Sequence, residues 1–209
     1  MENAKEVIEK TIDTYNKIAP LYAKYNSNKL FQFQIAKLIS FLPDKGNVLD
    51  AGCGSGRDSL YFKEEGINVI SIDLSDGMIE EAKKNNVDVI KVDLLSMSFD
   101  NNEFSGVWCM ATLINIPKSE APKLIKDFHK ILKPDGILYV AVKYGNTECM
   151  IEREKYNNLP LYNAFYSKEE LEKLLKENDF EIIESIVSTE DDSTKWIEIF
   201  AKNIKAIIE

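Results

Sequence analysis

The sequence predicts an α/β fold in which a doubly wound, mostly parallel sheet carries helices on both faces. Short apolar segments alternate with single amphipathic segments between residues 47 and 143, as in consecutive β-α-β units. A glycine-rich turn separates the first strand from its helix. Two β-rich segments at 180–188 and 195–202 form a hairpin, which adds an antiparallel end to the sheet.

Each element has its own support in the sequence. Residues 3–42 predict helices, with Pro20 in a first helical turn, where a missing N–H is tolerated. Ser75 caps one helix, and Ser167-x-x-Glu170 is a capping box that opens another. The other strands are expected at 47–50, 67–73, 87–93, 106–110 and 136–143. After residue 42, helices are expected at 58–65, 75–85, 119–132 and 167–178.

Length and charge limit the classes of function. The 209 residues suffice for one domain over 1–209, with a helical lid over 1–42 and an irregular substrate-side insertion over 144–166. Lys and Arg number 26 against 35 Asp and Glu, and this net charge of -9 gives no positive face for duplex DNA. The longest apolar run, 137–142, is too short to span a bilayer. We expect a cytoplasmic protein that binds neither DNA nor membranes, and the oligomeric state stays open.

Metal chemistry is not expected. The three cysteines are widely spaced and form no C-x-x-C pair, and His129 is the one histidine in the chain. The sequence therefore predicts reduced thiols and no metal site.

The glycine turn lies in the segment VLDAGCGSGR at 48–57. A dinucleotide site would need G-x-G-x-x-G, with a pyrophosphate at the helix N-terminus. Here Arg57 occupies the position of the third glycine, and the Asp58 carboxylate would repel a pyrophosphate. The turn better suits a zwitterion whose amine meets Asp50 and whose carboxylate meets Arg57 or backbone N–H groups. An NAD-dependent oxidoreductase is disfavoured for the same reasons.

Two acidic residues follow the next two strands. Asp73 ends the second strand, where its carboxylate can accept both hydroxyls of a ribose, and Asp93 ends the third, in position for an exocyclic amine. Ligands of such sheets bind beyond the carboxyl ends of the strands. A glycine turn followed by two acidic strand ends is a stronger signal than the turn alone.

Four ordered blocks between residues 45 and 145, VLDAGCGSG, SIDLSDGMIEEA, KVDLLSMSF and LKPDGILYVAVK, resemble the class I S-adenosylmethionine-dependent methyltransferases. The chain is most similar to a bacterial and archaeal subgroup, mostly of unassigned substrate. The resemblance implies a seven-stranded sheet whose last strand is antiparallel, with S-adenosylmethionine across the tips of the first four strands. The Asn-Pro-Pro-aromatic motif is absent from MATLINIP at 110–117, which argues against planar amide or adenine nitrogens as acceptors.

The resemblance also implies roles for single residues. Asp73 takes the ribose, Leu74 and Met78 flank the adenine, and Asp93 and the Leu94 amide read the adenine edge. The residues expected around the methionine and sulfonium part are Asp50, Gly52, Gly54, Gly56, Arg57 and Met110.

Three tyrosines in the N-terminal helix, Tyr15, Tyr22 and Tyr25, fall at helical spacing and can share a face. Two interpretations stay open: the rings pack in the interior, or they form a lid in which Tyr15 and Tyr22 cover the methionine end. Many relatives have His where Asn115 stands, so a base role is not expected there. The acceptor-side candidates are Tyr25, Asn115, Lys143, Arg153, Tyr166 and Trp196.

We therefore expect an S-adenosylmethionine-dependent methyltransferase that moves a methyl group to a small-molecule acceptor by in-line displacement. Two alternatives remain: the same enzyme acting on tRNA or another macromolecule, and a non-catalytic S-adenosylmethionine-binding module. The sequence does not identify the acceptor or the atom that is methylated.

Overall fold

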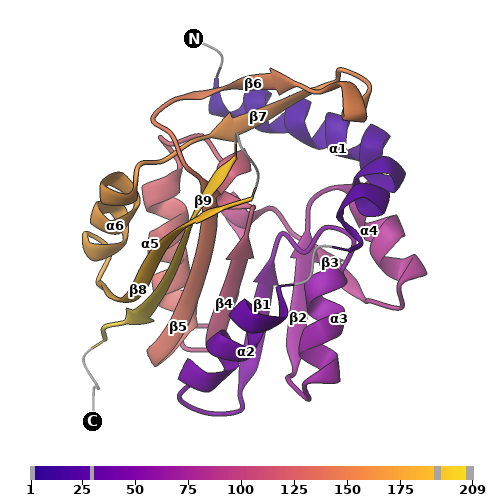
Figure 1. The fold of residues 1–209 in the computed structure, drawn as a ribbon. Helices are drawn as coiled ribbons and strands as arrows, with labels where there is room; N and C mark the ends of the chain where they lie inside the picture. The colour runs from indigo at the N-terminus through magenta and orange to yellow at the C-terminus, as the bar shows by residue number, and fades with distance from the viewer. Residues whose placement is uncertain (1–2, 29–30, 191–193, 206–209) are drawn as a thin grey trace.

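The computed structural model describes residues 3–28, 31–190 and 194–205, and it shows a seven-stranded sheet with helices on both faces (Figure 1). The strand order is β3-β2-β1-β4-β5-β9-β8. Strands β1 to β5 are parallel, and β9 is antiparallel to both of its neighbours. The doubly wound α/β fold and its closing hairpin are thereby confirmed.

The strands of the sheet are β1 (Asn47–Ala51), β2 (Val69–Asp73), β3 (Val89–Lys91), β4 (Phe104–Met110), β5 (Leu132–Lys143), β8 (Phe180–Thr189) and β9 (Lys195–Asn203). A separate two-stranded sheet consists of β6 (Glu148–Glu152) and β7 (Pro160–Ala164). The helices are α1 (Ala4–Asn26), α2 (Gln32–Phe41), α3 (Arg57–Glu64), α4 (Asp76–Lys84), α5 (Ala121–Ile131) and α6 (Lys168–Lys176), with 3-10 turns at Leu94–Ser96, Leu113–Asn115 and Glu154–Tyr156.

The order of strands reverses beside β1, and this reversal places the site. β2 lies on one side of β1, and β4 lies on the other, although β2 and β3 come between β1 and β4 in the chain. In such open sheets the connections leave β1 and β4 in opposite directions, and a crevice opens at their carboxyl ends. α1 and the β6–β7 hairpin lie across this same edge of the sheet (Figure 1).

The core has two layers, one on each face of the sheet. On one face, Leu124 and Phe128 of α5 and Leu171 of α6 pack among buried strand residues. On the other, Leu38 of α2 and Phe62 of α3 pack over the sheet in the second apolar cluster. Burying a side chain of this size contributes about 1.5–3 kcal/mol. Helices thus pack on both faces of the central strands.

α1 is one continuous helix, and Pro20 lies inside it rather than in a first turn as expected. Asn3 caps its start, where the side-chain oxygen accepts from the Lys5 N–H. Proline cannot donate to the carbonyl four residues earlier, that of Asn16. The Asn16 carbonyl oxygen lies close to Gly77 of α4, and α1 continues past the proline in spite of the lost hydrogen bond.

Asn16 also fixes α1 to the start of α4. Its side-chain oxygen accepts from the Ser75 hydroxyl at 2.8 Å and from the Gly77 N–H at 3.1 Å. α1 thereby lies next to the end of β2, from which α4 starts. Within the described part of the chain, no helix is both long and apolar enough to cross a bilayer.

The expectation of an irregular segment over 144–166 is wrong, because β6 and β7 pair in an antiparallel hairpin within it. The turn uses Asn157 and Asn158 in left-handed conformations, which explains the Asn-rich sequence there. The hairpin contacts α1 directly: the Thr14 hydroxyl donates to the Pro160 carbonyl at 2.8 Å. Residues 144–166 therefore form an ordered layer above the strand ends.

We predict that Gly77→Ala destabilises the protein and loosens α1, although alanine is the better helix former. An added Cβ would lie 2.7 Å from the Asn16 carbonyl oxygen and 2.9 Å from its Cα, so one helix must move. Overpacking of this kind costs about 1–3 kcal/mol. Chemical denaturation measures the loss, and hydrogen exchange over 4–26 locates it.

Glu80→Ala, at an exposed position of the same helix, is the matched control for helix propensity. A Gly77→Ala protein as stable as wild type, with unchanged exchange in α1, would show that this contact does not hold the helix.

Candidate active site

The glycine turn after β1 needs backbone conformations that favour glycine. Gly52 and Gly54 have φ of +77° and +55°, in the left-handed region. A Cβ on Gly52 would lie 2.5 Å from the Thr112 side chain, whereas a Cβ on Gly54 would have no atom within 4 Å. Gly52 thus allows close packing against the end of β4, and Gly54 faces open space at the strand ends.

Asp73 joins this turn to the end of β2. One carboxylate oxygen accepts from the Gly54 N–H at 2.8 Å, and the other accepts from the Ser75 N–H at 2.9 Å. Burial raises the pKa of Asp73 above its ordinary value, although these N–H donors favour the charged form. A carboxylate has about four acceptor sites, so each oxygen retains capacity for one more donor.

Three cavities matter for the site. The first lies at the ends of β2 and β3, and we call it the β2–β3 cavity. Asp73 and Asp93 line it with an apolar set made of Leu74, Met78 and Leu94. Asp93 also caps the turn that follows, where its side chain accepts from the Leu95 N–H at 2.9 Å. Apolar walls with two carboxylates suit a flat heterocycle that carries hydroxyl and amine donors.

The second hollow, the glycine-turn cavity, has a volume of about 530 Å³. It is lined by Asp50, Cys53, Arg57, Asp58, Phe31, Gln34, Trp196 and Glu198, and it shares Gly52, Gly54, Tyr22 and Met110 with the β2–β3 cavity. The two hollows are therefore adjoining parts of one crevice at the carboxyl ends of β1, β2 and β4.

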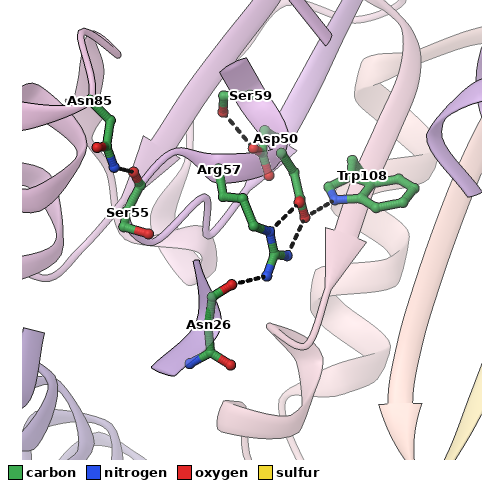
Figure 2. Close-up of polar contacts among 8 residues, drawn as sticks. Asn26, Asp50, Ser55, Arg57, Ser59, Asn85 and Trp108 are labelled. Atoms are coloured by element: carbon green, nitrogen blue, oxygen red, sulfur yellow. Dashed lines mark hydrogen bonds and ion pairs between the residues drawn. The ribbon is translucent and has the colours of Figure 1, made fainter. Parts of the chain in front are cut away.

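Arg57 and Asp58 form an ion pair at the start of α3. The Arg57 Nε lies 2.7 Å from one Asp58 oxygen, and the Trp108 indole N–H donates to the other at 2.9 Å. A terminal nitrogen of Arg57 also donates to the Asn26 carbonyl (Figure 2). The guanidinium thus joins the end of α1 to α3, and it pairs with the Asp58 carboxylate.

Asp50 lies behind the turn and is almost completely buried. Burial, together with the neighbouring Asp58 charge, raises the pKa of Asp50 to about 8. The Ser59 hydroxyl donates to Asp50 at 2.5 Å (Figure 2). The Ser71 hydroxyl in turn donates to Ser59 at 2.8 Å. Asp50 is therefore largely protonated near pH 7.

Tyrosine rings cover the crevice from above. Tyr15 and Tyr22 of α1 meet edge to face with ring centroids 5.4 Å apart, and Tyr156 lies 5.7 Å from Tyr22. Tyr15 also accepts from the Asn115 side-chain amide at 3.1 Å. Burial raises the pKa of Tyr22 to about 12 and raises that of Tyr15 as well, so both phenols are neutral.

A third hollow, the hairpin cavity, lies under β6 and β7. It is lined by Lys143, Arg153, Lys155, Tyr156, Leu161, Asn163, Glu190 and Trp196, together with Tyr15 and Tyr22. Three predicted acceptor-side residues, Lys143, Arg153 and Trp196, thus lie together beside the tyrosine cover. Their role remains a prediction.

Three predicted site residues line none of these cavities. Gly56 packs against Val87, which a Cβ would approach to 2.8 Å, so this glycine serves packing. Tyr25 is 49% exposed at the end of α1. Tyr166 is buried in the core, because backbone pairing with Lys143 directs the side chain inward.

Several residues of the crevice were not anticipated, and four of them show which signals the sequence offered. Ala111, with φ of +56°, and Thr112 follow β4 directly, and their place after a parallel strand was a usable signal. Gln34 and Glu198 are brought together by tertiary structure: Gln34 donates to Glu198 at 3.1 Å across the sheet edge. No local sequence pattern marks that pair.

The fold and the site together define a Rossmann-like α/β protein with a ligand crevice at the reversal of strand order. A family model described as a methyltransferase domain matches residues 48–136. Carboxy-S-adenosyl-L-methionine synthase from Nautilia profundicola is 30% identical over 184 residues, which cover 85% of this chain and 73% of that protein. The chain belongs to the class I S-adenosylmethionine-dependent methyltransferase family.

Other relatives share less of their length or sequence. Putative methyltransferase YqeM from Bacillus subtilis is 27% identical over 59% of this chain and 53% of that protein. The chain spans 65% and 51% of two malonyl-[acyl-carrier protein] O-methyltransferases, from Enterobacter lignolyticus and Hamiltonella defensa. The structure of Burkholderia thailandensis 1,6-didemethyltoxoflavin-N1-methyltransferase, with bound 1,6-didemethyltoxoflavin and S-adenosylhomocysteine, has a TM-score of 0.78 at 18% identity, covering 98% of this chain and 92% of that one.

We predict that Asp50→Asn becomes increasingly stabilising relative to wild type as pH rises from about 4 to about 8. The folded protein keeps a proton on Asp50 that the unfolded chain, with the ordinary pKa of 3.8, releases in this range. Wild-type stability therefore falls with rising pH by on the order of a few kcal/mol, and the amide removes this loss. Urea denaturation at several pH values measures the difference, with exposed Asp88→Asn as control. A stability difference that stays constant over this range contradicts the protonated Asp50.

Proposed function

We propose that the protein transfers a methyl group from S-adenosylmethionine to a small-molecule acceptor. The proposal of a small-molecule acceptor rests on the cover over the crevice. Tyr15 and Tyr22 of α1 and Tyr156 of the hairpin enclose the strand ends, and the glycine-turn cavity beside Tyr22, with about 530 Å³, is of metabolite size. A macromolecular acceptor would need this edge of the sheet to be open.

The residues present fit the cofactor. In this proposal the β2–β3 cavity takes the adenosine part, with the spare acceptor sites of Asp73 directed to the ribose and Asp93 to the adenine amine. The methionine part enters the glycine-turn cavity, where Gly54 leaves room. An ammonium group there would favour the charged form of Asp50.

S-adenosylmethionine, when bound, supplies a methyl group whose bond to sulfur breaks, with its electron pair left on sulfur, as the acceptor forms the new bond. The chain's own task is to hold the acceptor in line, which can supply roughly 7–11 kcal/mol of the barrier. Tyr15 and Tyr22 are neutral rings beside Met110, so they exclude water without acting as bases.

Two alternatives are less well supported. A tRNA acceptor needs a positive surface, and the chain carries a net charge of -9. A binding module without turnover needs no room beside the cofactor, whereas the hairpin cavity adjoins the crevice. A small acceptor also agrees with the name of one relative in fold, 1,6-didemethyltoxoflavin-N1-methyltransferase.

Methyl-labelled S-adenosylmethionine tests the proposal directly. The purified protein is incubated with it and either a deproteinised metabolite extract or bulk tRNA, and the label is followed in each. We expect label in the small-molecule fraction only. Label in tRNA would show that the acceptor is a macromolecule. Tight binding of S-adenosylhomocysteine without any transfer would indicate a non-catalytic binding module.

We predict that Asp73→Ala weakens S-adenosylmethionine binding roughly ten- to a hundredfold, since hydrogen bonds to a charged acceptor are worth about 1.5–3 kcal/mol. Titration calorimetry measures the affinity. Asp88→Ala, an exposed carboxylate before β3, is the control and should bind as wild type does. An unchanged dissociation constant in Asp73→Ala would refute the ribose assignment.

A further inference from the structure

The hairpin cavity differs from the rest of the crevice in its charge. The glycine-turn cavity contains four carboxylates and one guanidinium: Asp50, Asp58, Glu190, Glu198 and Arg57. The described residues that line the hairpin cavity include three cationic side chains, Lys143, Arg153 and Lys155, and one acidic one, Glu190, and both lysines and Glu190 have further partners within the protein. The guanidinium of Arg153 is therefore the cation to consider for a ligand of opposite sign.

Lys143 is held rigidly within this hollow. It is the last residue of β5 and is only 8% exposed. Its ammonium donates to the Asn163 side-chain oxygen at 2.6 Å and lies 6.0 Å from the centre of the Trp196 ring. Lys143 thus lines the hollow from a fixed position.

Arg153 offers a guanidinium to the same hollow from the end of β6. Among the described residues, no side chain forms an ion pair with Arg153, and its guanidinium donates no hydrogen bond. Arg57, the other arginine, is fully engaged with Asp58 and Asn26. A guanidinium presents parallel N–H donors that match a carboxylate or a phosphate.

The cationic hollow reaches the place where the methyl group would be transferred. Tyr15, Tyr22 and Ala111 line both the hairpin cavity and the β2–β3 cavity. Arg153 and Ala111 therefore line the same hollow, and Ala111 also lines the β2–β3 cavity beside the end of β4.

We propose that the methyl acceptor is a small organic anion whose non-reacting carboxylate or phosphate binds Arg153 and Lys143. Its nucleophilic atom is then directed toward Tyr22 and Ala111. This inference rests on the proposed function and adds the chemical class of the acceptor. The cavity volume of about 110 Å³ admits such a group together with a short stem, and it excludes a polymer chain.

Binding of matched probes to the full chain, saturated with S-adenosylhomocysteine, tests this. The pairs are 4-hydroxybenzoate and 4-hydroxybenzamide, succinate and succinamide, and phenyl phosphate and phenol. Thermal shift identifies the binding members, and calorimetry measures their affinities. We expect at least one anion to bind about tenfold or more tightly than its neutral partner, and the pair that responds distinguishes carboxylate from phosphate.

Arg153→Met should remove about tenfold of that preference, and Arg153→Lys should restore part of it. Lys173→Met, which removes an exposed charge from α6, is the control and should change nothing. Affinity for S-adenosylhomocysteine should stay within about twofold in all three variants, because Arg153 lies outside the cofactor hollows.

Equal binding of neutral and anionic partners, an Arg153→Met protein that keeps the full preference, or no response to any anion would each overturn this inference. If S-adenosylhomocysteine binds wild type tightly in those cases, the proposed function survives and only the acceptor class fails. If S-adenosylhomocysteine does not bind, the proposed function fails and this inference fails with it.

Discussion

The site depends on the two hydrogen bonds that the Asp73 carboxylate accepts. Asp73 is the last residue of β2, and its two oxygens bind the Gly54 N–H and the Ser75 N–H. One side chain thereby fixes the turn after β1 and the start of α4. α1 is attached to the same point through Asn16 and Ser75. The turn after β1, the start of α4 and the covering helix α1 are therefore all held at the end of β2.

The charge of the lining side chains changes along the crevice, which fits ligands whose parts differ in charge. Acidic groups gather at the glycine turn, where Asp50 is protonated because of its burial and the Asp58 charge. The opposite end, beneath the hairpin, carries Arg153 and Lys143. The tyrosine cover lies between them and carries no charge at neutral pH. A cationic methyl donor and an anionic acceptor would thus each meet charge of the opposite sign.

The sequence predicted the sheet, the glycine turn and the acidic strand ends, because these follow local rules. Strand and helix periodicities alternate, and Asp73 and Asp93 stand at the ends of two successive β-type segments of the sequence. The sequence did not predict the interior position of Pro20, because proline favours a first helical turn and the contacts that hold α1 against α4 join residues far apart in the sequence. Glu198 and Gln34 were missed for the same reason, and Tyr166 was misplaced because its backbone pairing turns the ring into the core. The hairpin over 144–166 was missed because a Tyr- and Asn-rich composition resembles a loop.

The central claim is that S-adenosylmethionine lies across the carboxyl ends of β1, β2 and β4, held by Asp73. A crystal structure of the protein with S-adenosylhomocysteine tests it most directly. The account predicts both ribose hydroxyls within hydrogen-bonding distance of the Asp73 carboxylate and the adenine between Leu74 and Met78. A ligand found elsewhere, or a ribose with no contact to Asp73, would contradict it.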